Sequence, residues 1–117
     1  MTVDEAIREL LGVSTDVRRV AVIGRDDEVL GAGPGAVGAD VGSVASGLWE
    51  AASRRAKALG DASLDHVFVR DEAGGVAVVR EGDRSVAALT VPDPALGLLF
   101  FDLRTCLTDS LTGEETS

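Results

Sequence analysis

Residues 64–91 read L-D-H-V-F-V-R-D-E-A-G-G-V-A-V-V-R-E-G-D-R-S-V-A-A-L-T-V, and this stretch decides the fold. It holds three Val-rich runs, at 64–70, 76–80 and 85–91, separated by the short links D-E-A-G-G and E-G-D-R. Links this short cannot carry a crossover, so the runs predict three antiparallel strands joined as a meander. The runs are apolar at both parities, which indicates that both faces of the sheet are covered.

A further pair of strands precedes the meander. V-R-R-V-A-V-I-G at residues 17–24 and E-V-L-G-A-G at residues 28–33 are joined by a short acidic turn. The same argument from link length predicts an antiparallel hairpin. Between the hairpin and the meander, apolar residues recur at helical spacing over residues 36–59 and stop at Gly60. They predict one long helix that crosses from the hairpin to the meander.

Helices are also expected near the two ends of the chain. The first begins with a capping box formed by Thr2 and Glu5, and it is predicted to stop at Gly12. The last has Pro94 at its first helical position and runs to about Leu111. The order is therefore α-β-β-α-β-β-β-α. It predicts an α+β fold in which a five-stranded antiparallel sheet carries helices on both faces.

The chain has 117 residues and a mass of 12.0 kDa, which is typical of one domain. We assign residues 1–111 to this domain and residues 112–117 to a polar C-terminal tail. The first residues carry acids where a signal peptide carries bases. The longest strongly apolar stretch, residues 95–101, is about a third of the ~20 residues that a membrane span needs. We therefore expect a cytoplasmic protein with no insertion into membranes.

The net charge and the scarcity of aromatic, Cys and His residues exclude several classes of binding partner. The formal net charge is -9, which disfavours DNA, RNA and acidic membrane surfaces as partners. Aromatic residues are only 3% of the chain, so stacking platforms for single-stranded nucleic acid are not expected. One Cys and one His leave too few soft ligands for a zinc site. No metal and no cofactor is predicted.

No arrangement of residues predicts catalysis. G-P-G-A-V-G at residues 33–38 has the spacing of a dinucleotide-binding loop, but it follows the second arm of a hairpin. No acidic residue comes about 20 residues later to contact a ribose. We interpret the motif as a turn of small residues, with an anion at the helix N-terminus as the alternative. His66 and Cys106 have no partner that would activate them, so we expect a protein that is not an enzyme.

The strand at 64–70 is expected to lie at an open edge of the sheet. In the simplest winding, the last strand of the meander pairs with the hairpin and leaves 64–70 outermost. This strand has no Pro and no Lys, which usually protect such edges. The long helix beside it carries a seam of small residues and one large ring, which would allow close packing of two helices. Two copies are therefore expected to join edge to edge as a homodimer, with their long helices antiparallel.

The predicted dimer interface takes residues from the seam of the long helix and from the edge strand. They are Ala45, Trp49, Ala52, Ala56, His66, Val67, Phe68 and Val69. On the same helix, Arg54 and Arg55 are predicted to contact a partner protein, because Arg is favoured at interfaces. The alternative is that both are solvated side chains.

In these features the sequence resembles the Roadblock family, which includes dynein light chains of the Roadblock type and bacterial Mgl-type gliding regulators. The resemblance covers nearly the whole chain and rests on the order of elements and on three stretches. These are V-A-V-I-G-R-D-D-E-V-L-G-A-G at 20–33, K-A-L-G at 57–60, and P-A-L-G-L-L-F-F-D-L-R at 94–104. It implies homodimers or heterodimers with a continuous ten-stranded sheet and paired long helices, and it supplies no catalytic residue to match.

The resemblance also implies a function. The expected protein is a non-catalytic scaffold or regulator that binds a Ras-like small GTPase and modulates its GTP hydrolysis, or serves as an adaptor. A histidine-kinase-like ATPase and another Roadblock-type chain are further partners that it implies. The alternative is a small-molecule sensor domain of PAS or profilin-like architecture. The scarcity of aromatic residues disfavours a sensor, whereas a cavity of a few hundred Å³ under the long helix would favour it.

Overall fold

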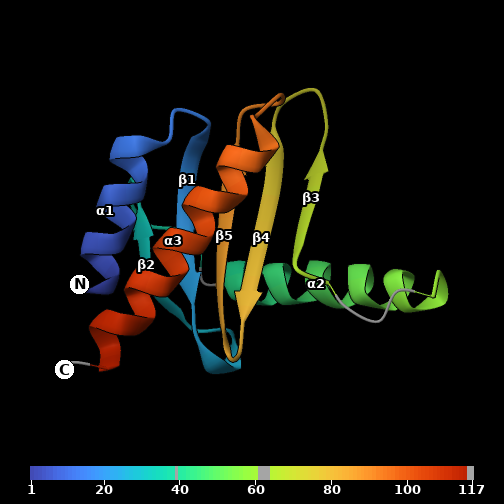
Figure 1. Ribbon diagram of the computed structural model, residues 1–117, viewed down its shortest axis with the longest axis horizontal. Helices are drawn as coiled ribbons and strands as arrows, with labels where there is room; N and C mark the ends of the chain where they lie inside the picture. Colours follow the sequence, from blue (N-terminus) through green and yellow to red (C-terminus); the bar gives the residue numbers. More distant parts are fainter. Residues whose placement is uncertain (39, 61–63, 116–117) are drawn as a thin grey trace.

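The order of helices and strands is the predicted one (Figure 1). A computed structural model describes residues 1–38, 40–60 and 64–115, and side-chain burial up to Leu111. The elements are α1 (Val3–Val13), β1 (Val17–Ile23), the 3-10 turn η1 (Arg25–Asp27), β2 (Val29–Gly33), α2 (Val41–Ala58), β3 (His66–Arg70), β4 (Gly75–Glu81), β5 (Arg84–Thr90) and α3 (Leu96–Glu115).

The strands form one five-stranded sheet in the order β2-β1-β5-β4-β3, and every neighbouring pair is antiparallel. The hairpin β1–β2 joins the meander because β1 pairs with β5, with Ala21 opposite Ala87 and Val22 opposite Val86. This arrangement confirms that the last strand of the meander lies next to the hairpin. It leaves β3 at one border of the sheet and β2 at the other.

One face of the sheet is covered by α1 and α3, which pack against each other and against the strands (Figure 1). The sheet contributes one parity of its residues to this layer, such as Val22 of β1 and Val86 of β5. From α3, Leu99, Leu103 and Leu107 recur every four residues and are fully buried. This layer holds the main hydrophobic core of the protein.

The other face carries α2 alone, so helices do lie on both faces as predicted (Figure 1). The opposite parity of the strands, including Ala21 and Val78, packs here against Ala45 of α2. Only Gly42 and Ala45 of this helix are buried, and both lie in its first third. In Figure 1 the C-terminal half of α2 extends beyond β3, past the border of the sheet.

The first turn of α2 is anchored to η1 at very close range. A Cβ atom on Gly42 would lie 1.8 Å from the carbonyl oxygen of Asp27, so only glycine fits there. One turn later, the Ser46 hydroxyl donates a short hydrogen bond to the Asp27 carboxylate. Asp26 and Asp27 both have positive φ, 61° and 63°, which L-residues adopt at a cost. This turn therefore fixes where α2 begins its path across the sheet.

Three helix ends differ from the prediction. Helix α1 continues through Gly12 to Val13, because Gly12 is exposed and has open space around it. Helix α3 begins at Leu96 rather than Pro94, with the Asp16 carboxylate accepting the Ala95 N–H at 2.9 Å just before it. It then runs to Glu115, past the expected end near residue 111.

The long helix also begins later than expected, at Val41 instead of residue 36. The segment before it is held as a loop. The Arg19 guanidinium donates hydrogen bonds to the carbonyl oxygens of Pro34 at 3.1 Å and Ala36 at 2.7 Å. Because these carbonyl oxygens accept hydrogen bonds from Arg19, they are not used in a helix, and the segment stays a loop. Gly35, with φ at 78°, provides the turn in this loop.

Candidate functional site

The outer border of β3 is open. Within the described residues β3 pairs only with β4, in the register that sets Val67 opposite Val78 and Val69 opposite Val76. The other side of this strand therefore presents its N–H and C=O groups to solvent. Val69 is 51% exposed and points to the α2 face of the sheet, as its partner Val76 does. The predicted open edge is present.

The opposite parity of β3 is fixed by α3. The ring of His66 stacks on Phe100, with the ring centroids 3.8 Å apart and an angle of 24° between the planes. Arg104 Nη2 lies 3.4 Å from His66 Nδ1. Phe68 packs against the main core and lies so close to Gly75 that a Cβ there would be 2.6 Å from the ring. These side chains hold the edge strand in place within its own chain.

The predicted seam on α2 separates into two parts. Ala45 is buried against its own sheet, so its side chain has almost no surface left for a second copy. Trp49, Ala52 and Ala56 are only half buried. They continue the sheet-facing stripe of the helix toward the end that extends past β3 (Figure 1). We call these three residues the overhang stripe.

Arg54 and Arg55 lie outside the overhang stripe. At 100° per residue, Arg54 lies about 140° around the helix from Trp49 and Arg55 about 120° on the other side. Both are exposed, as is Lys57. In the part of the chain that the structure describes, none of the three side chains forms a hydrogen bond or an ion pair. The end of α2 is therefore a basic patch on a chain whose net charge is -9.

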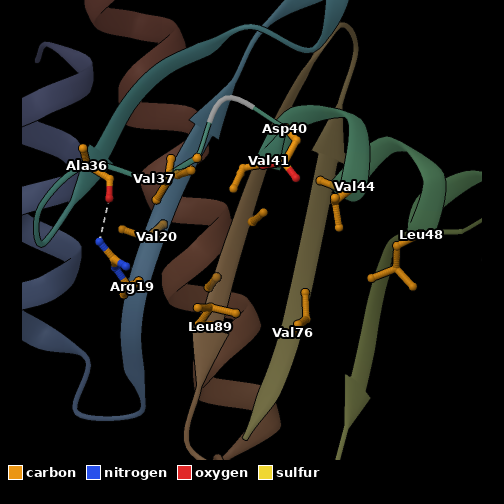
Figure 2. Close-up of a pocket in the computed structure, with 15 residues that line it drawn as sticks. Arg19, Val20, Ala36, Val37, Asp40, Val41, Val44, Leu48, Val76 and Leu89 are labelled. Atoms are coloured by element: carbon orange, nitrogen blue, oxygen red, sulfur yellow. Dashed lines mark hydrogen bonds between the residues drawn. The ribbon is translucent and has the colours of Figure 1, made fainter.

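A groove of about 310 Å³ lies between the first half of α2 and the sheet (Figure 2). Val41, Val44 and Leu48 line it from the helix, and Val76 and Leu89 line it from the strands. Arg19 stands at one end, with its guanidinium on the loop carbonyl described above. Val44 and Leu89 are both exposed, so the groove opens to solvent. A cavity of a few hundred Å³ under the long helix was the feature expected to favour a small-molecule sensor domain, and this groove has that size.

The remaining candidates for chemistry are Cys106, the glycine-rich segment and a metal site. Burial, with a smaller contribution from the charge of Asp109, raises the pKa of the Cys106 thiol to about 12, so the thiol stays protonated. Gly33 packs on Ile7 and Leu11, as the interpretation of the glycine-rich segment as a close-packed turn requires. The described residues contain no group of three metal-ligating side chains placed to hold an ion. Nor do they include a helix whose length and hydropathy suit a membrane span.

The chain matches no family model and no curated protein. It does match solved structures. A Roadblock/LC7 domain from Streptomyces avermitilis superposes with a TM-score of 0.79 at 15% identity, over 93% of this chain and 94% of that one. The gliding protein MglB from Thermus thermophilus superposes with a TM-score of 0.73 at 22% identity, over 95% and 87% of the two chains.

A profilin-like structure gives a weaker match. LokiProfilin2, in a complex with rabbit actin, superposes with a TM-score of 0.54 at 17% identity, over 91% of this chain and 93% of that one. Identities this low bear on the fold alone. Together with the sheet order and the arrangement of helices, these likenesses show that the chain has a Roadblock-type fold.

Proposed function

We propose that the chain is a non-catalytic, homodimeric regulator in the cytoplasm that binds a Ras-like small GTPase. The observation that carries the proposal is the open edge of β3 beside the overhang stripe of α2. An apolar edge strand with exposed Val69 and no Pro or Lys is a template for pairing. A second copy of the same strand satisfies it with a closed, self-complementary interface.

The proposed dimer follows from the geometry of the edge. A two-fold axis through the β3 border sets the two β3 strands antiparallel and yields a continuous sheet of twice five strands. Both α2 helices then lie on the same face, side by side and antiparallel. Each overhang stripe lies over the second copy, where Val69, Val76 and Leu89 leave apolar surface uncovered. Trp49 supplies the largest side chain of this contact.

The proposed GTPase surface is the side of α2 that faces away from the overhang stripe. Arg54, Arg55 and Lys57 form a basic patch there, which favours a partner with an acidic contact surface. The sequence resemblance to Roadblock proteins and the Roadblock-type fold support a Ras-like GTPase as that partner. Regulation would come from ordering the switch loops, because their order controls such GTPases. An ATPase of the histidine-kinase type and a second Roadblock-type chain remain further predicted partners.

The test uses the full chain and a small GTPase of the same organism. Calorimetry with GDP and with a non-hydrolysable GTP analogue measures binding, and single-turnover assays measure GTP hydrolysis. The double variant R54E/R55E is expected to weaken GTPase binding while the dimer stays intact. The matched control R8E/R80E makes the same change in charge at two exposed arginines elsewhere. Absence of binding in both nucleotide states contradicts the proposal for that GTPase.

The groove under α2 favours a second candidate function, a small-molecule sensor. Its volume of about 310 Å³ falls within the range of ligand sites, and apolar side chains line it together with two charged ones, Arg19 and Asp40. This lining suits an apolar molecule whose anionic group contacts Arg19. A thermal-shift screen of such carboxylates tests it, because a ligand at 100 times its Kd adds about 2.7 kcal/mol to the free energy of unfolding. If the α2 helices of a dimer fill the groove, these carboxylates should leave the melting temperature unchanged.

A further inference from the structure

Helices α1 and α3 lie side by side on the face of the sheet opposite α2 (Figure 1). A second groove lies between these two helices. Its volume is about 210 Å³. The floor is apolar and buried, and it consists of Ala6 and Leu10 from α1 and Cys106 from α3. All three belong to the main core, so the groove lies at the outer margin of that core.

Large apolar side chains stand exposed around this groove. Phe101 is 66% exposed and Val13 is 63% exposed, and both line it. Leu98, which is 60% exposed, lies one turn before Phe101 on the same side of α3. Exposed leucines and valines are ordinary when scattered, but a cluster around a concave surface indicates an interaction site.

The rim of the groove is acidic. Glu9 of α1 and Asp102 and Asp109 of α3 line it, and no basic residue among those described does. The negative charge reaches the floor: besides burial, the charge of Asp109 raises the pKa of the Cys106 thiol. Apolar anchors surrounded by three carboxylates complement a ligand that is apolar on one side and positively charged along its flanks.

We propose that the groove between α1 and α3 binds a short basic amphipathic helix of another protein. The lining of α1 runs from Ala6 to Val13, which is two helical turns or about 10 Å. A third helix laid between α1 and α3 would seat apolar side chains at spacings of three, four and seven residues. Its Lys and Arg side chains would face Glu9, Asp102 and Asp109. The site is independent of the β3 edge and of the proposed GTPase surface.

The charge argues against two other occupants. The chain's own C-terminal residues, T-G-E-E-T-S, contain two acids and no base. A second copy of the chain brings a formal net charge of -9. Both would place negative charge against three carboxylates, which disfavours them. A basic helix from a different protein removes that repulsion and covers the exposed Phe101.

The experiment is a display selection with a library of random 16-residue peptides on the immobilised full chain. Enriched peptides are expected to carry Leu, Ile or Phe at spacings of three and four residues with Lys or Arg between them. Fluorescence anisotropy of two synthesised winners then gives Kd values, and amide chemical shifts locate the bound peptide. Shifts are expected on α1 and α3 and not on α2.

Two variants test the contacts. E9Q/D102N/D109N is expected to weaken binding about tenfold at low salt, and Phe101→Ala by a similar factor. The control E28Q/E72Q/E81Q removes three exposed carboxylates elsewhere and should leave the Kd unchanged. Circular dichroism and thermal melts check that each variant is folded. Three results would overturn the proposal: no enrichment over the triple variant, enrichment of acidic peptides, or equal weakening by the control.

Discussion

The two faces of the sheet are covered to very different degrees. Within the described part of the chain, the core between the sheet and α1 and α3 contains fifteen buried residues, whereas the core under α2 contains four. Two helices with Leu and Phe side chains close the first face. One helix lies on the second, and its inner side packs through Val41, Ala45, Leu48 and Trp49. The first face therefore holds most of the buried apolar side chains, and the second holds few.

The difference comes from the path of α2. This helix is anchored at its start by the close approach of Gly42 to Asp27, and it then runs past the sheet border (Figure 1). Leu48 and Trp49, at the middle of the helix, still pack against the core under α2, and the half that follows them extends past the border. A helix that extends past an open edge adds little to the core of its own chain. It is suited to an interface, because part of its apolar stripe is not covered by that chain.

The largest expected effect separates the two cores directly. Leu103→Ala on the closed face should lower the free energy of unfolding by about 3 to 5 kcal/mol, because the side chain is fully buried. Leu48→Ala under α2 should cost only about 1 kcal/mol, because Leu48 is half exposed. Urea denaturation of both variants, at concentrations below the Kd of the proposed dimer, measures the two costs. Equal losses would contradict the contrast between the faces.

The second prediction concerns the proposed dimer. Val69→Lys places a charge on the open edge of β3 and should weaken self-association about a hundredfold, or about 2.7 kcal/mol. Analytical ultracentrifugation measures the change. Trp49, the only Trp of the chain, provides an independent signal, since its emission should shift to the red on dissociation. Val13→Lys is the matched control, because this exposed Val lies on the opposite face and its replacement should leave the dimer intact.

A third prediction tests the anchor of α2. Gly42→Ala should lower the free energy of unfolding by about 1 to 3 kcal/mol, since the new methyl group collides with the backbone of Asp27. Gly47→Ala, one turn and a half later, meets nothing within 4 Å and should raise stability by about 0.5 to 1 kcal/mol through helix propensity. Thermal melts of the two variants show whether each substitution raises or lowers stability. A stabilising Gly42→Ala would show that this contact does not position the helix.

The smallest effect is a pH dependence of the closed face. Burial raises the pKa of Cys106 from 9.0 to about 12, so above pH 9 the unfolded chain loses this proton before the folded chain does. Stability from this group is present below pH 9 and declines as pH rises toward 12. Between pH 9 and 10.5 the decline should be about 1 to 2 kcal/mol. Cys106→Ala should remove this part of the slope in urea melts, and an unchanged slope would contradict the assignment.

Some site residues could be found from the sequence and others could not. The open edge with Val69 followed from link lengths and from the absence of Pro and Lys. Ala45 was assigned to the dimer seam because it shares a helical stripe with Trp49, yet it is buried in its own chain. Periodicity shows that residues share a stripe, but it does not show how far along the stripe the sheet extends. The groove beside Phe101 was missed because α1 and α3 meet only in three dimensions.

The sequence by itself determined the order of elements and the antiparallel pairing within the hairpin and within the meander. Those features depend on spacings of two to four residues and on links too short to allow another topology. Tertiary structure alone decided where α2 begins, how far it extends past the sheet and which stripes stay uncovered. These depend on contacts between residues far apart in the chain, such as Gly42 with Asp27 and helix α1 with helix α3, which local sequence patterns do not specify.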